Sequence, residues 1–315
     1  MKRAFVFPGQ GSQAPGMGQA LAEAFAPARL LFDEVDEALS QNLSRLMFEG
    51  PESELTLTEN AQPALLAASL AVIRVLECEA GFDIARHAAY VAGHSLGEYS
   101  ALAAARALSV ADAVRLVRRR GRAMQKAVPV GEGAMAALLG LEIDAAREVA
   151  LAACNGHGQV CAVANDNSPG QIVVSGHRAA VERAVVLAAE QGARRSIMLP
   201  VSAPFHSPLM SPAAAAMAEA LTDAHLAAPV VPLVANVTAA PTSDPCEIKE
   251  LLIAQVTHMV RWRESVQLFV ASEVEEVVEI GCGRVLAGLV KRIDRSLAAS
   301  SVGAPAELAA LASRL

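Results

Sequence analysis

The stretch YVAGHSLGEYSALAAA, from Tyr90 to Ala105, joins a short apolar run directly to an alanine-rich run. The first run is typical of a buried strand and the second of a helix, so the chain must turn sharply between them. Ser95 lies at that turn, with Gly93 before it and Gly97 after it. Glycines let a strand and a helix approach closely, and the start of a helix directs free N–H groups and its dipole at the turn. The sequence therefore predicts a strained turn that presents the Ser95 hydroxyl as a nucleophile.

Strands and helices alternate around this turn. Apolar runs predict buried strands at Ala4 to Phe7 and at Tyr90 to Ala92. Helical patterns are found at Gly18 to Ala26, Pro27 to Leu39, Thr58 to Ala80 (with Gly81 as a stop) and Leu96 to Ala107. This alternation favours an α/β fold with a mainly parallel sheet that helices cover on both faces.

The middle of the chain predicts a second, smaller unit. Its expected elements follow the order β-α-β-β-α-β, which is the ferredoxin-like arrangement. They are Ala134 to Leu141, Ile143 to Ala153, Val160 to Ala164, Ile172 to Ser175, Arg178 to Gln191 and Arg195 to Leu199. Glycine-rich and proline-containing segments on either side are typical of domain crossings. We therefore expect residues 1–129 and 201–315 to form one large α/β domain, and residues 130–200 to form an inserted ferredoxin-like subdomain.

The composition excludes several classes of protein. Of the 315 residues, 53% are hydrophobic and 19% are charged, so the chain can bury a large core. A net charge of -7 argues against a general nucleic-acid-binding protein. No export signal or membrane span is expected, because the N-terminal apolar run ends at Pro8 and the apolar segment Ala61 to Leu76 is short and interrupted by polar residues. We expect neither nucleic acid nor a membrane among the partners.

The cysteines are typical of a reducing compartment. They are five, scattered and without a CxxC pair: Cys78, Cys154, Cys161, Cys246 and Cys282. We therefore expect free thiols and a cytoplasmic protein. Neither the cysteines nor the histidines form a metal-ligand pattern, so we expect no metal and no bound cofactor.

A nucleophilic serine needs a base, and His206 is the candidate. It lies in LPVSAPFHSPLM, an irregular loop between prolines that follows the last strand of the expected insert. Loops at strand ends are where α/β domains place catalytic groups. The other histidines are expected at the surface or in satisfied core positions: His87, His94, His157, His177, His225 and His258.

The helix ADAVRLVRRRGRAMQK, from Ala111 to Lys126, carries a second functional signal. On a helical wheel Arg120 falls at the centre of the apolar stripe. The other basic residues fall on the opposite side, which we expect to face solvent: Arg115, Arg118, Arg119, Arg122 and Lys126. A guanidinium that faces the core needs an anion. That anion is either an internal Asp or Glu, or a carboxylate on a substrate, which arginine binds through two parallel hydrogen bonds.

Taken together, several segments resemble one known family. They are FPGQGSQ at Phe7 to Gln13, GHSLGEYSALAAA at Gly93 to Ala105, RGRAMQ at Arg120 to Gln125, NSPGQIVVSG at Asn167 to Gly176 and PFHSPLM at Pro204 to Met210. The same segments in the same order are found in the malonyl-CoA:acyl carrier protein transacylases of bacterial type II fatty-acid synthesis, and the resemblance runs from Phe5 to Ile293. It implies a hydrolase-like α/β domain with an inserted ferredoxin-like subdomain, in agreement with the outline above.

The resemblance implies a role for each matching residue. Ser95 matches the nucleophile that carries the malonyl ester, and His206 matches its base. Arg120 matches the arginine that binds the free malonyl carboxylate. Gln10 and Leu96 match the two backbone N–H donors of the oxyanion hole. The implied reaction is ping-pong: the serine takes malonyl from malonyl-CoA and passes it to the phosphopantetheine thiol of holo acyl carrier protein.

Other positions carry weaker implications. A backbone carbonyl orients the base in the family, and the match places it at Arg261 in THMVRW. The chain departs from the family pattern at Met259, where a proline is more usual. Phe205 resembles the large residue of malonyl-selective relatives. The residues that could line the pocket are Gln62, Met124, Met135, Asn165 and Phe205.

Other functions stay open from the sequence alone. A serine esterase or hydrolase shares the G-x-S-x-G turn, but normally places an Asp between the serine and a late histidine. A catalytically silent carrier-docking protein does not need an intact Ser95, His206 and Arg120. A related acyltransferase of polyketide synthesis or malonate decarboxylation shares the chemistry and differs in its carrier. We expect a monomer with malonyl-CoA and acyl carrier protein as partners.

Overall fold

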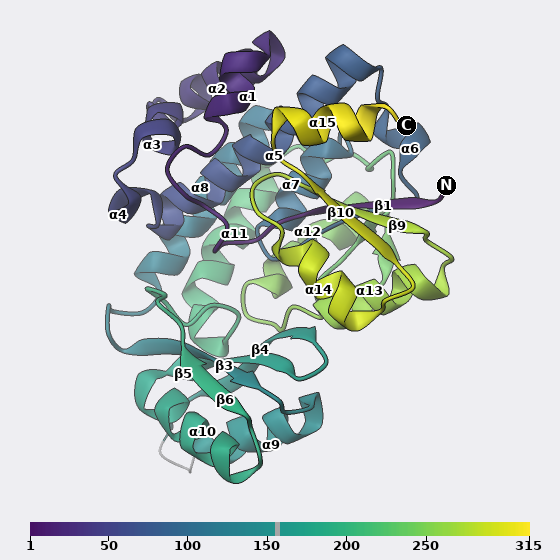
Figure 1. Cartoon of the computed structure of the whole chain (residues 1–315). Coiled ribbons are helices and arrows are strands. Elements are labelled where there is room, and N and C mark those ends of the chain that lie inside the picture. Colours follow the sequence, from purple (N-terminus) through teal and green to yellow (C-terminus); the bar gives the residue numbers. More distant parts are fainter. Residues whose placement is uncertain (155–157) are drawn as a thin grey trace.

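The computed structural model describes residues 1–154 and 158–315, and this part of the chain forms two β-sheets (Figure 1). The larger sheet has the strand order β10-β9-β1-β2-β7-β8. Its strands are β1 (Arg3–Phe7), β2 (Tyr90–Gly93), β7 (Leu233–Val234), β8 (Pro241–Thr242), β9 (Glu276–Ile280) and β10 (Ala298–Val302). Neighbouring strands run parallel except for β7 and β8. The predicted mainly parallel sheet is confirmed.

The central strand β1 shows why this sheet needs helices on both faces. Successive side chains of a strand point to opposite faces. Phe5 and Phe7 pack into one hydrophobic cluster, whereas Ala4 and Val6 pack into another. All four side chains are fully buried. Both faces of the sheet are therefore apolar and must be covered.

The helices divide between these two faces (Figure 1). Helices α5 (Thr58–Ala80), α7 (Gly97–Ala104) and α8 (Val110–Lys126) pack into the first cluster. Helices α13 (Trp262–Ala271) and α14 (Val285–Ile293) pack into the second. The other helices outside the small sheet are α1 (Gln19–Ala24), α2 (Ala26–Leu39), α3 (Leu43–Glu49), α4 (Glu52–Leu55), α6 (Ile84–His87), a 3-10 helix (Pro208–Met210), α11 (Ser211–Asp223), α12 (Pro245–Gln255) and α15 (Pro305–Ala312).

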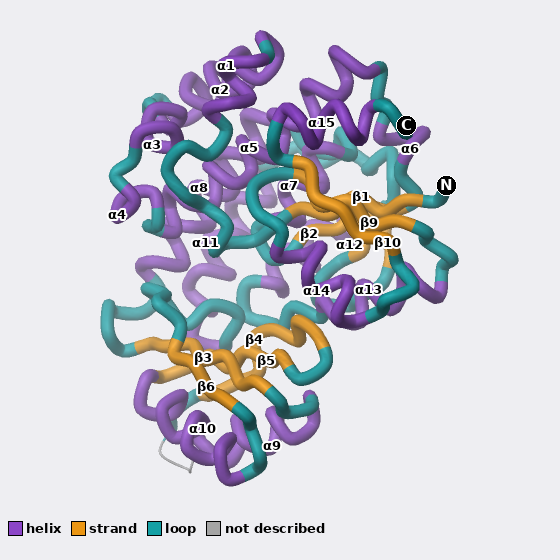
Figure 2. The backbone as a smooth tube through the Cα atoms, in the orientation of Figure 1, coloured by secondary structure: helices purple, strands orange, loops and turns teal. Residues whose placement is uncertain are grey.

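The smaller sheet comes from the middle of the chain and lies apart from the larger one (Figure 2). Its strands pair antiparallel in the order β4-β5-β3-β6. The elements in chain order are β3 (Gly133–Leu139), α9 (Ile143–Cys154), β4 (Cys161–Ser168), β5 (Gln171–His177), α10 (Arg178–Glu190) and β6 (Arg195–Met198). Both helices pack on the sheet through alanine and valine side chains. The predicted β-α-β-β-α-β order is confirmed.

Strand β4 ties the small sheet to the large part of the molecule. Asn165 and Val260 form an isolated parallel bridge. The Val260 N–H donates to the Ala164 carbonyl at 2.9 Å, and the Asp166 N–H donates to the Val260 carbonyl at 3.0 Å. The Asp166 side chain is fully buried and pairs with Arg263 at 2.8 Å. The edge of the small sheet is thus fixed to the segment just before α13.

Helix α5 has the bounds predicted from the sequence, Thr58–Ala80. It spans 23 residues and, within the described residues, is the one helix long and apolar enough to cross a membrane. The expectation that this segment is too short to cross is therefore wrong. Yet 83% of its apolar 18-residue stretch is buried inside the fold, as in the core helix of a globular domain.

The predicted strained turn at Ser95 is confirmed. Ser95 has a φ of 54°, in the left-handed region that non-glycine residues rarely adopt. A methyl group on Gly93 would lie 1.8 Å from the carbonyl carbon of Gly97. A methyl group on Gly97 would lie 2.2 Å from the carbonyl oxygen of Phe7. The two glycines therefore allow β1, β2 and α7 to touch through their backbones.

We expect Gly93→Ala to destabilise the fold by about 3 kcal/mol or more, because the clashing atoms are backbone atoms that cannot rotate away. The matched control is Gly288→Ala, since Gly288 lies on the exposed side of α14 and a methyl group there meets nothing within 4 Å. A helical change of this kind stabilises by about 0.5–1 kcal/mol. Urea unfolding measures both changes, and a wild-type midpoint for Gly93→Ala would contradict the close packing described here.

Candidate active site

Ser95 and His206 meet at the carboxyl end of the large sheet. The Ser95 Oγ lies 2.8 Å from the His206 Nε2. Ser95 comes from the turn between β2 and α7, and His206 from the loop before the 3-10 helix. His206 is 4% exposed and, like Ser95, has a left-handed backbone, with a φ of 56°. The two residues selected from the sequence are therefore in hydrogen-bond contact inside the fold.

The surrounding hydrogen bonds fix the protons on these two side chains. The His206 Nδ1 lies 2.8 Å from the Gln255 carbonyl oxygen, which can only accept. Nδ1 therefore carries the ring hydrogen, and Nε2 is free to accept the Ser95 hydroxyl. The Arg120 Nη2 donates to the Ser95 Oγ at 3.0 Å, so the hydroxyl hydrogen points at His206. The pair is set for proton transfer from serine to histidine.

The carbonyl that orients His206 belongs to Gln255, so the prediction of Arg261 is wrong. Gln255 is the last residue of α12. Arg261 caps the start of α13, and its carbonyl accepts from the Ser265 N–H at 3.0 Å. The end of α12, and not the start of α13, lies against the histidine.

Burial lowers the pKa of His206 from 6.5 to about 3, and the charge of Arg120 acts in the same direction. The Gln255 carbonyl opposes this shift, because it accepts from Nδ1. The imidazole is therefore neutral at pH 7 and well below it, which is the form that a general base requires.

Arg120 faces the core, as the helical wheel predicts. It is 1% exposed, and its guanidinium carbon lies 6.0 Å from the centre of the Tyr99 ring. Its Nη1 donates to the Gln62 Oε1 at 2.9 Å, and its Nη2 donates to the Gln255 Oε1 at 2.8 Å in addition to the Ser95 hydroxyl. All three acceptors are neutral. The guanidinium is therefore held beside the serine by hydrogen bonds to uncharged oxygens.

The helical wheel predicts that Arg118 faces solvent, and this prediction is wrong. It is 6% exposed, and its Nη1 donates to the Asn60 Oδ1 at 2.8 Å. Asn60 belongs to the first turn of α5, which covers this side of α8. The other basic residues expected on the outer face are exposed: Arg115, Arg119, Arg122 and Lys126.

A chain of hydrogen bonds connects Arg120 to the loop after β1. The Gln62 Nε2 donates to the Thr58 Oγ1 at 2.9 Å, and this hydroxyl donates to the Gln10 Oε1 at 2.8 Å. Because the Gln62 Oε1 accepts from Arg120, both ends of its amide are fixed. The Met124 sulfur lies 3.8 Å from the Gln62 Nε2. Three of the residues selected from the sequence, Gln10, Gln62 and Met124, are thus connected to Arg120.

The two predicted N–H donors, Gln10 and Leu96, come from different segments of the chain. Leu96 is the N-cap of α7, and Gln10 belongs to the loop that follows β1. Among the backbone hydrogen bonds of residues 1–154 and 158–315, neither N–H donates to a protein acceptor. Both are free to donate to a ligand.

The remaining predicted pocket residues fall in two places. Phe205 packs both against the main core and against the cluster that contains Met135 on the small sheet. Asn165 is buried on β4, in the bridge to Val260. Phe205 therefore lies where the two sheets of the molecule approach each other, next to the candidate base.

Two polar residues of the site have no signal in the sequence. The Asn236 Oδ1 accepts from the Ser95 N–H at 2.7 Å, and its Nδ2 donates to the Gly93 carbonyl at 2.6 Å. The Gln255 Nε2 donates to the Ser95 carbonyl at 2.9 Å. Asn and Gln are common in loops and at helix ends, so nothing in their local pattern distinguishes these two.

Glu98 is a third residue that the sequence interpretation missed, although a signal existed. It is a charged residue within the apolar helix that follows Ser95, so it had to be buried. It is 1% exposed, and its carboxyl oxygens accept from the Asn236 N–H and the Gln255 Nε2. Burial raises the pKa of Glu98 to about 8, although these hydrogen bonds act to lower it.

Of the other histidines, His94 also lies at the site. Its Nε2 is 2.9 Å from the Asn167 Oδ1, and burial lowers the pKa of its ring. His157 lies outside the described residues. Within residues 1–154 and 158–315, no group of three or more His, Cys, Asp or Glu side chains could hold a metal ion.

The whole chain is similar to proteins of one kind. The acyl transferase domain family matches residues 4–312. A malonyl CoA-acyl carrier protein transacylase of Bacillus subtilis (strain 168) is 49% identical over 304 residues, which cover 96% of this chain and 94% of that protein. The chain belongs to the malonyl CoA-acyl carrier protein transacylase family.

Solved structures of this family have the same fold. The acyl-carrier-protein S-malonyltransferase of Bartonella henselae is 53% identical and superimposes with a TM-score of 0.96, over 99% of this chain and 98% of that one. A malonyl-transacylase in complex with a holo type II PKS acyl-carrier protein is 41% identical, with a TM-score of 0.96 over 100% of both chains. The α/β fold predicted from the sequence is therefore that of the family.

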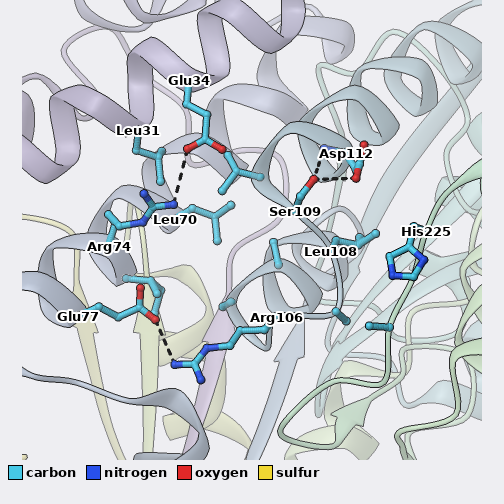
Figure 3. Close-up of a pocket in the computed structure, with 16 residues that line it drawn as sticks. Leu31, Glu34, Leu70, Arg74, Glu77, Arg106, Leu108, Ser109, Asp112 and His225 are labelled. Atoms are coloured by element: carbon cyan, nitrogen blue, oxygen red, sulfur yellow. Dashed lines mark hydrogen bonds and ion pairs between the residues drawn. The ribbon is translucent and has the colours of Figure 1, made fainter.

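The lining of a cavity of about 540 Å³, drawn in Figure 3, includes neither Ser95 nor His206. Residues of α2, α5 and α8 line it, with the loop between α7 and α8. Its charged side chains pair with one another, Arg74 with Glu34 and Arg106 with Glu77, each at 3.7 Å. Neither Ser95 nor a residue bonded to it lines this cavity, so we do not assign the chemistry of the family to it.

We expect the imidazole of His206 to stay neutral from pH 8 down to pH 5, because burial holds its pKa near 3. An ordinary histidine, with a pKa of about 6.5, would be almost fully protonated at pH 5. The ring nitrogen shifts of the labelled protein, followed by NMR, measure this, and the signals lost in His206→Ala assign the ring. A midpoint near 6.5 for these signals would mean that the ring is open to water.

Proposed function

We propose that this protein transfers a malonyl group from malonyl-CoA to the phosphopantetheine thiol of an acyl carrier protein, through a malonyl ester of Ser95. The arrangement around the Ser95 Oγ carries the proposal: a neutral histidine at 2.8 Å and the guanidinium of Arg120 at 3.0 Å. An acyl group on this oxygen extends beside Arg120, which suits an acyl chain that ends in a carboxylate. The names of the relatives support both the malonyl group and the carrier.

The first half-reaction forms the ester. The Ser95 Oγ attacks the thioester carbonyl carbon while its proton moves to the His206 Nε2. The N–H groups of Gln10 and Leu96 donate to the oxyanion, and such donors contribute about 3 kcal/mol each. The Gln255 carbonyl stabilises the charged ring, because it accepts from Nδ1. When the carbon–sulfur bond breaks, the CoA sulfur takes the proton from Nε2 and leaves.

The second half-reaction uses the same groups in the opposite direction. The phosphopantetheine thiol gives its proton to the His206 Nε2, and its sulfur attacks the carbonyl carbon of malonyl-Ser95. The ester bond breaks, and the Ser95 oxygen takes the proton back. Because one serine serves two thiols in turn, we expect ping-pong kinetics.

A serine esterase is the nearest rival. Its histidine is normally oriented by a carboxylate. Here the carbonyl of Gln255 takes that place. An esterase for neutral esters also has no use for the buried charge of Arg120. Both observations favour acyl transfer.

We propose the carrier protein of fatty-acid synthesis as the physiological acceptor. Carriers of polyketide synthesis present the same thiol, so the choice depends on the protein surface around it. Direct transfer assays with purified carriers of both kinds distinguish the two.

We assign residues 1–129 and 201–315 to the catalytic domain and residues 130–200 to an inserted subdomain. The chain passes from the large sheet to the small sheet and back near these boundaries, which supports the division. We also propose that the protein acts as a monomer in the cytoplasm, and its free cysteines support a reducing compartment. Light scattering of the purified protein tests the monomer.

We expect Ser95→Ala to abolish the acyl-enzyme, because the attacking oxygen is removed. The wild-type protein should gain the mass of one malonyl group when mixed with malonyl-CoA, and lose it when holo carrier protein is added. Ser100→Ala is the matched control, since Ser100 is a buried serine of α7, the helix that follows the Ser95 turn. Intact-protein mass spectrometry reads all three proteins, and an equal mass gain in Ser95→Ala would place the nucleophile elsewhere.

We expect Arg120→Ala to lower kcat/KM for malonyl-CoA by about a hundredfold or more, because a buried charged pair costs about 3–5 kcal/mol to break and each 1.4 kcal/mol is about tenfold. Because acetyl-CoA has no free carboxylate, its kcat/KM should fall far less. Arg120→Lys should restore only part of the loss, since an ammonium cannot make the two-pronged contact.

The matched control is Arg119→Ala, because Arg119 is exposed on the same helix and pairs with Glu219 at 3.0 Å. Arg119→Ala should leave kcat/KM unchanged for both malonyl-CoA and acetyl-CoA. Equal losses for malonyl-CoA and acetyl-CoA in Arg120→Ala would show that Arg120 supports the fold and does not bind the carboxylate.

A further inference from the structure

We propose that Glu98 is a positioning residue of this active site. Its buried carboxyl group holds Gln255 and Asn236, and these two residues hold the base, the guanidinium and the turn around the nucleophile. The inference rests on the proposed function, because it concerns the same site. It gives Glu98 no contact with the substrate.

The location of Glu98 makes its hydrogen bonds decisive. It lies in the first turn of α7, immediately behind the serine turn, and is 1% exposed. A carboxyl group removed from water is costly unless both of its oxygens are hydrogen-bonded. One oxygen accepts from the Asn236 N–H, and the other accepts from the Gln255 Nε2. Both bonds lead to residues that contact the serine turn.

The bond to Gln255 controls the direction of its amide. The Oε1 of this amide accepts from the Arg120 Nη2 at 2.8 Å, and its Nε2 donates to the Ser95 carbonyl at 2.9 Å. The second hydrogen of Nε2 goes to Glu98, so every group of the amide is used. The backbone carbonyl of the same residue orients His206. A single oxygen of Glu98 therefore helps to fix both the base and the guanidinium.

The bond to Asn236 supports the strained turn. The backbone N–H of Asn236 donates to Glu98, while its side chain bonds to the Ser95 N–H at 2.7 Å and to the Gly93 carbonyl at 2.6 Å. These two bonds hold the chain just before the left-handed residue, because the Gly93 carbonyl and the Ser95 N–H lie on either side of His94. The second oxygen of Glu98 therefore acts on the backbone position of the nucleophile.

The geometry needs two acceptors at this position. Both groups that face the carboxyl are N–H donors, so a glutamine would place its own N–H₂ against one of them. An aspartate keeps both acceptors but is one methylene shorter, so it reaches only one donor well. Glu98→Gln and Glu98→Asp therefore each lose one of the two contacts, in two chemically different ways.

The first test measures malonyl transfer to carrier protein. Glu98→Gln and Glu98→Asp should each lower kcat by about ten- to a hundredfold, the size expected when catalytic groups move by about 1 Å. Glu276→Gln is the matched control, because Glu276 is 2% exposed and lies at the start of β9, the end of the sheet opposite to the serine. It should keep the wild-type kcat. A wild-type kcat in both Glu98 variants overturns the proposal.

A double-mutant cycle shows whether Glu98 acts through Gln255. If it does, Glu98→Gln should cost much less in a Gln255→Ala background than in the wild-type background, since the contact that it disturbs is already absent. Equal fold losses in the two backgrounds overturn the proposed route. Where Glu98→Gln does not fold, Glu98→Asp takes its place in the cycle.

The last measurement does not depend on activity, so it separates this inference from the proposed function. The ring nitrogen signals of His206, followed by NMR, should shift in both Glu98 variants and stay unchanged in Glu276→Gln. If the wild-type protein transfers no malonyl group, the proposed function is wrong. The ring signals of His206 still test whether Glu98 positions the histidine. Unchanged ring signals in both Glu98 variants overturn the inference.

Discussion

The backbone of Gly97 lies against the carbonyl of Phe7, and the backbone of Gly93 lies against Gly97, so that neither glycine has room for a side chain. These contacts press the start of α7 onto the carboxyl ends of β1 and β2. Of the three residues between the glycines, Ser95 adopts a left-handed backbone at the turn from the strand to the helix. The same contact brings the loop after β1, with Gln10, to the side of the turn. The nucleophile and its surroundings are thus a consequence of how closely three backbones approach.

Burial decides the charges around this serine. It keeps the base neutral, so that the guanidinium of Arg120 stands among amide and hydroxyl oxygens. A cation in a medium of low polarity attracts an anion strongly, and neutral oxygens satisfy its hydrogen bonds without cancelling its charge. The site can therefore select an acyl group by its negative end as well as by its shape. This accounts for a buried arginine that pairs with no carboxylate in the described hydrogen bonds.

The sequence predicted those parts of the site that depend on local pattern. The strand, turn and helix at Ser95 follow from neighbouring residues, and the inward direction of Arg120 follows from the period of its own helix. The same period failed for Arg118, because a helical wheel cannot show that a second helix covers the outer side. The sequence also could not identify Gln255, since the carbonyl that accepts from the histidine depends on where the end of α12 lies in space. Glu98 was within reach, because a lone carboxylate in an apolar helix requires partners.

The position of β1 has a consequence for the order in which this protein can be made. Residues 3–7 pair with residues 90–93 on one side and with residues 276–280 on the other. A growing chain can therefore bring β1, β2 and α7 together, and with them the serine turn, long before the second neighbour of β1 has been synthesised. Until then the central strand keeps an open edge, which invites pairing with other chains. Contacts between such distant segments also slow folding, so the pairing of β1 with β9 is a late step in completing the sheet.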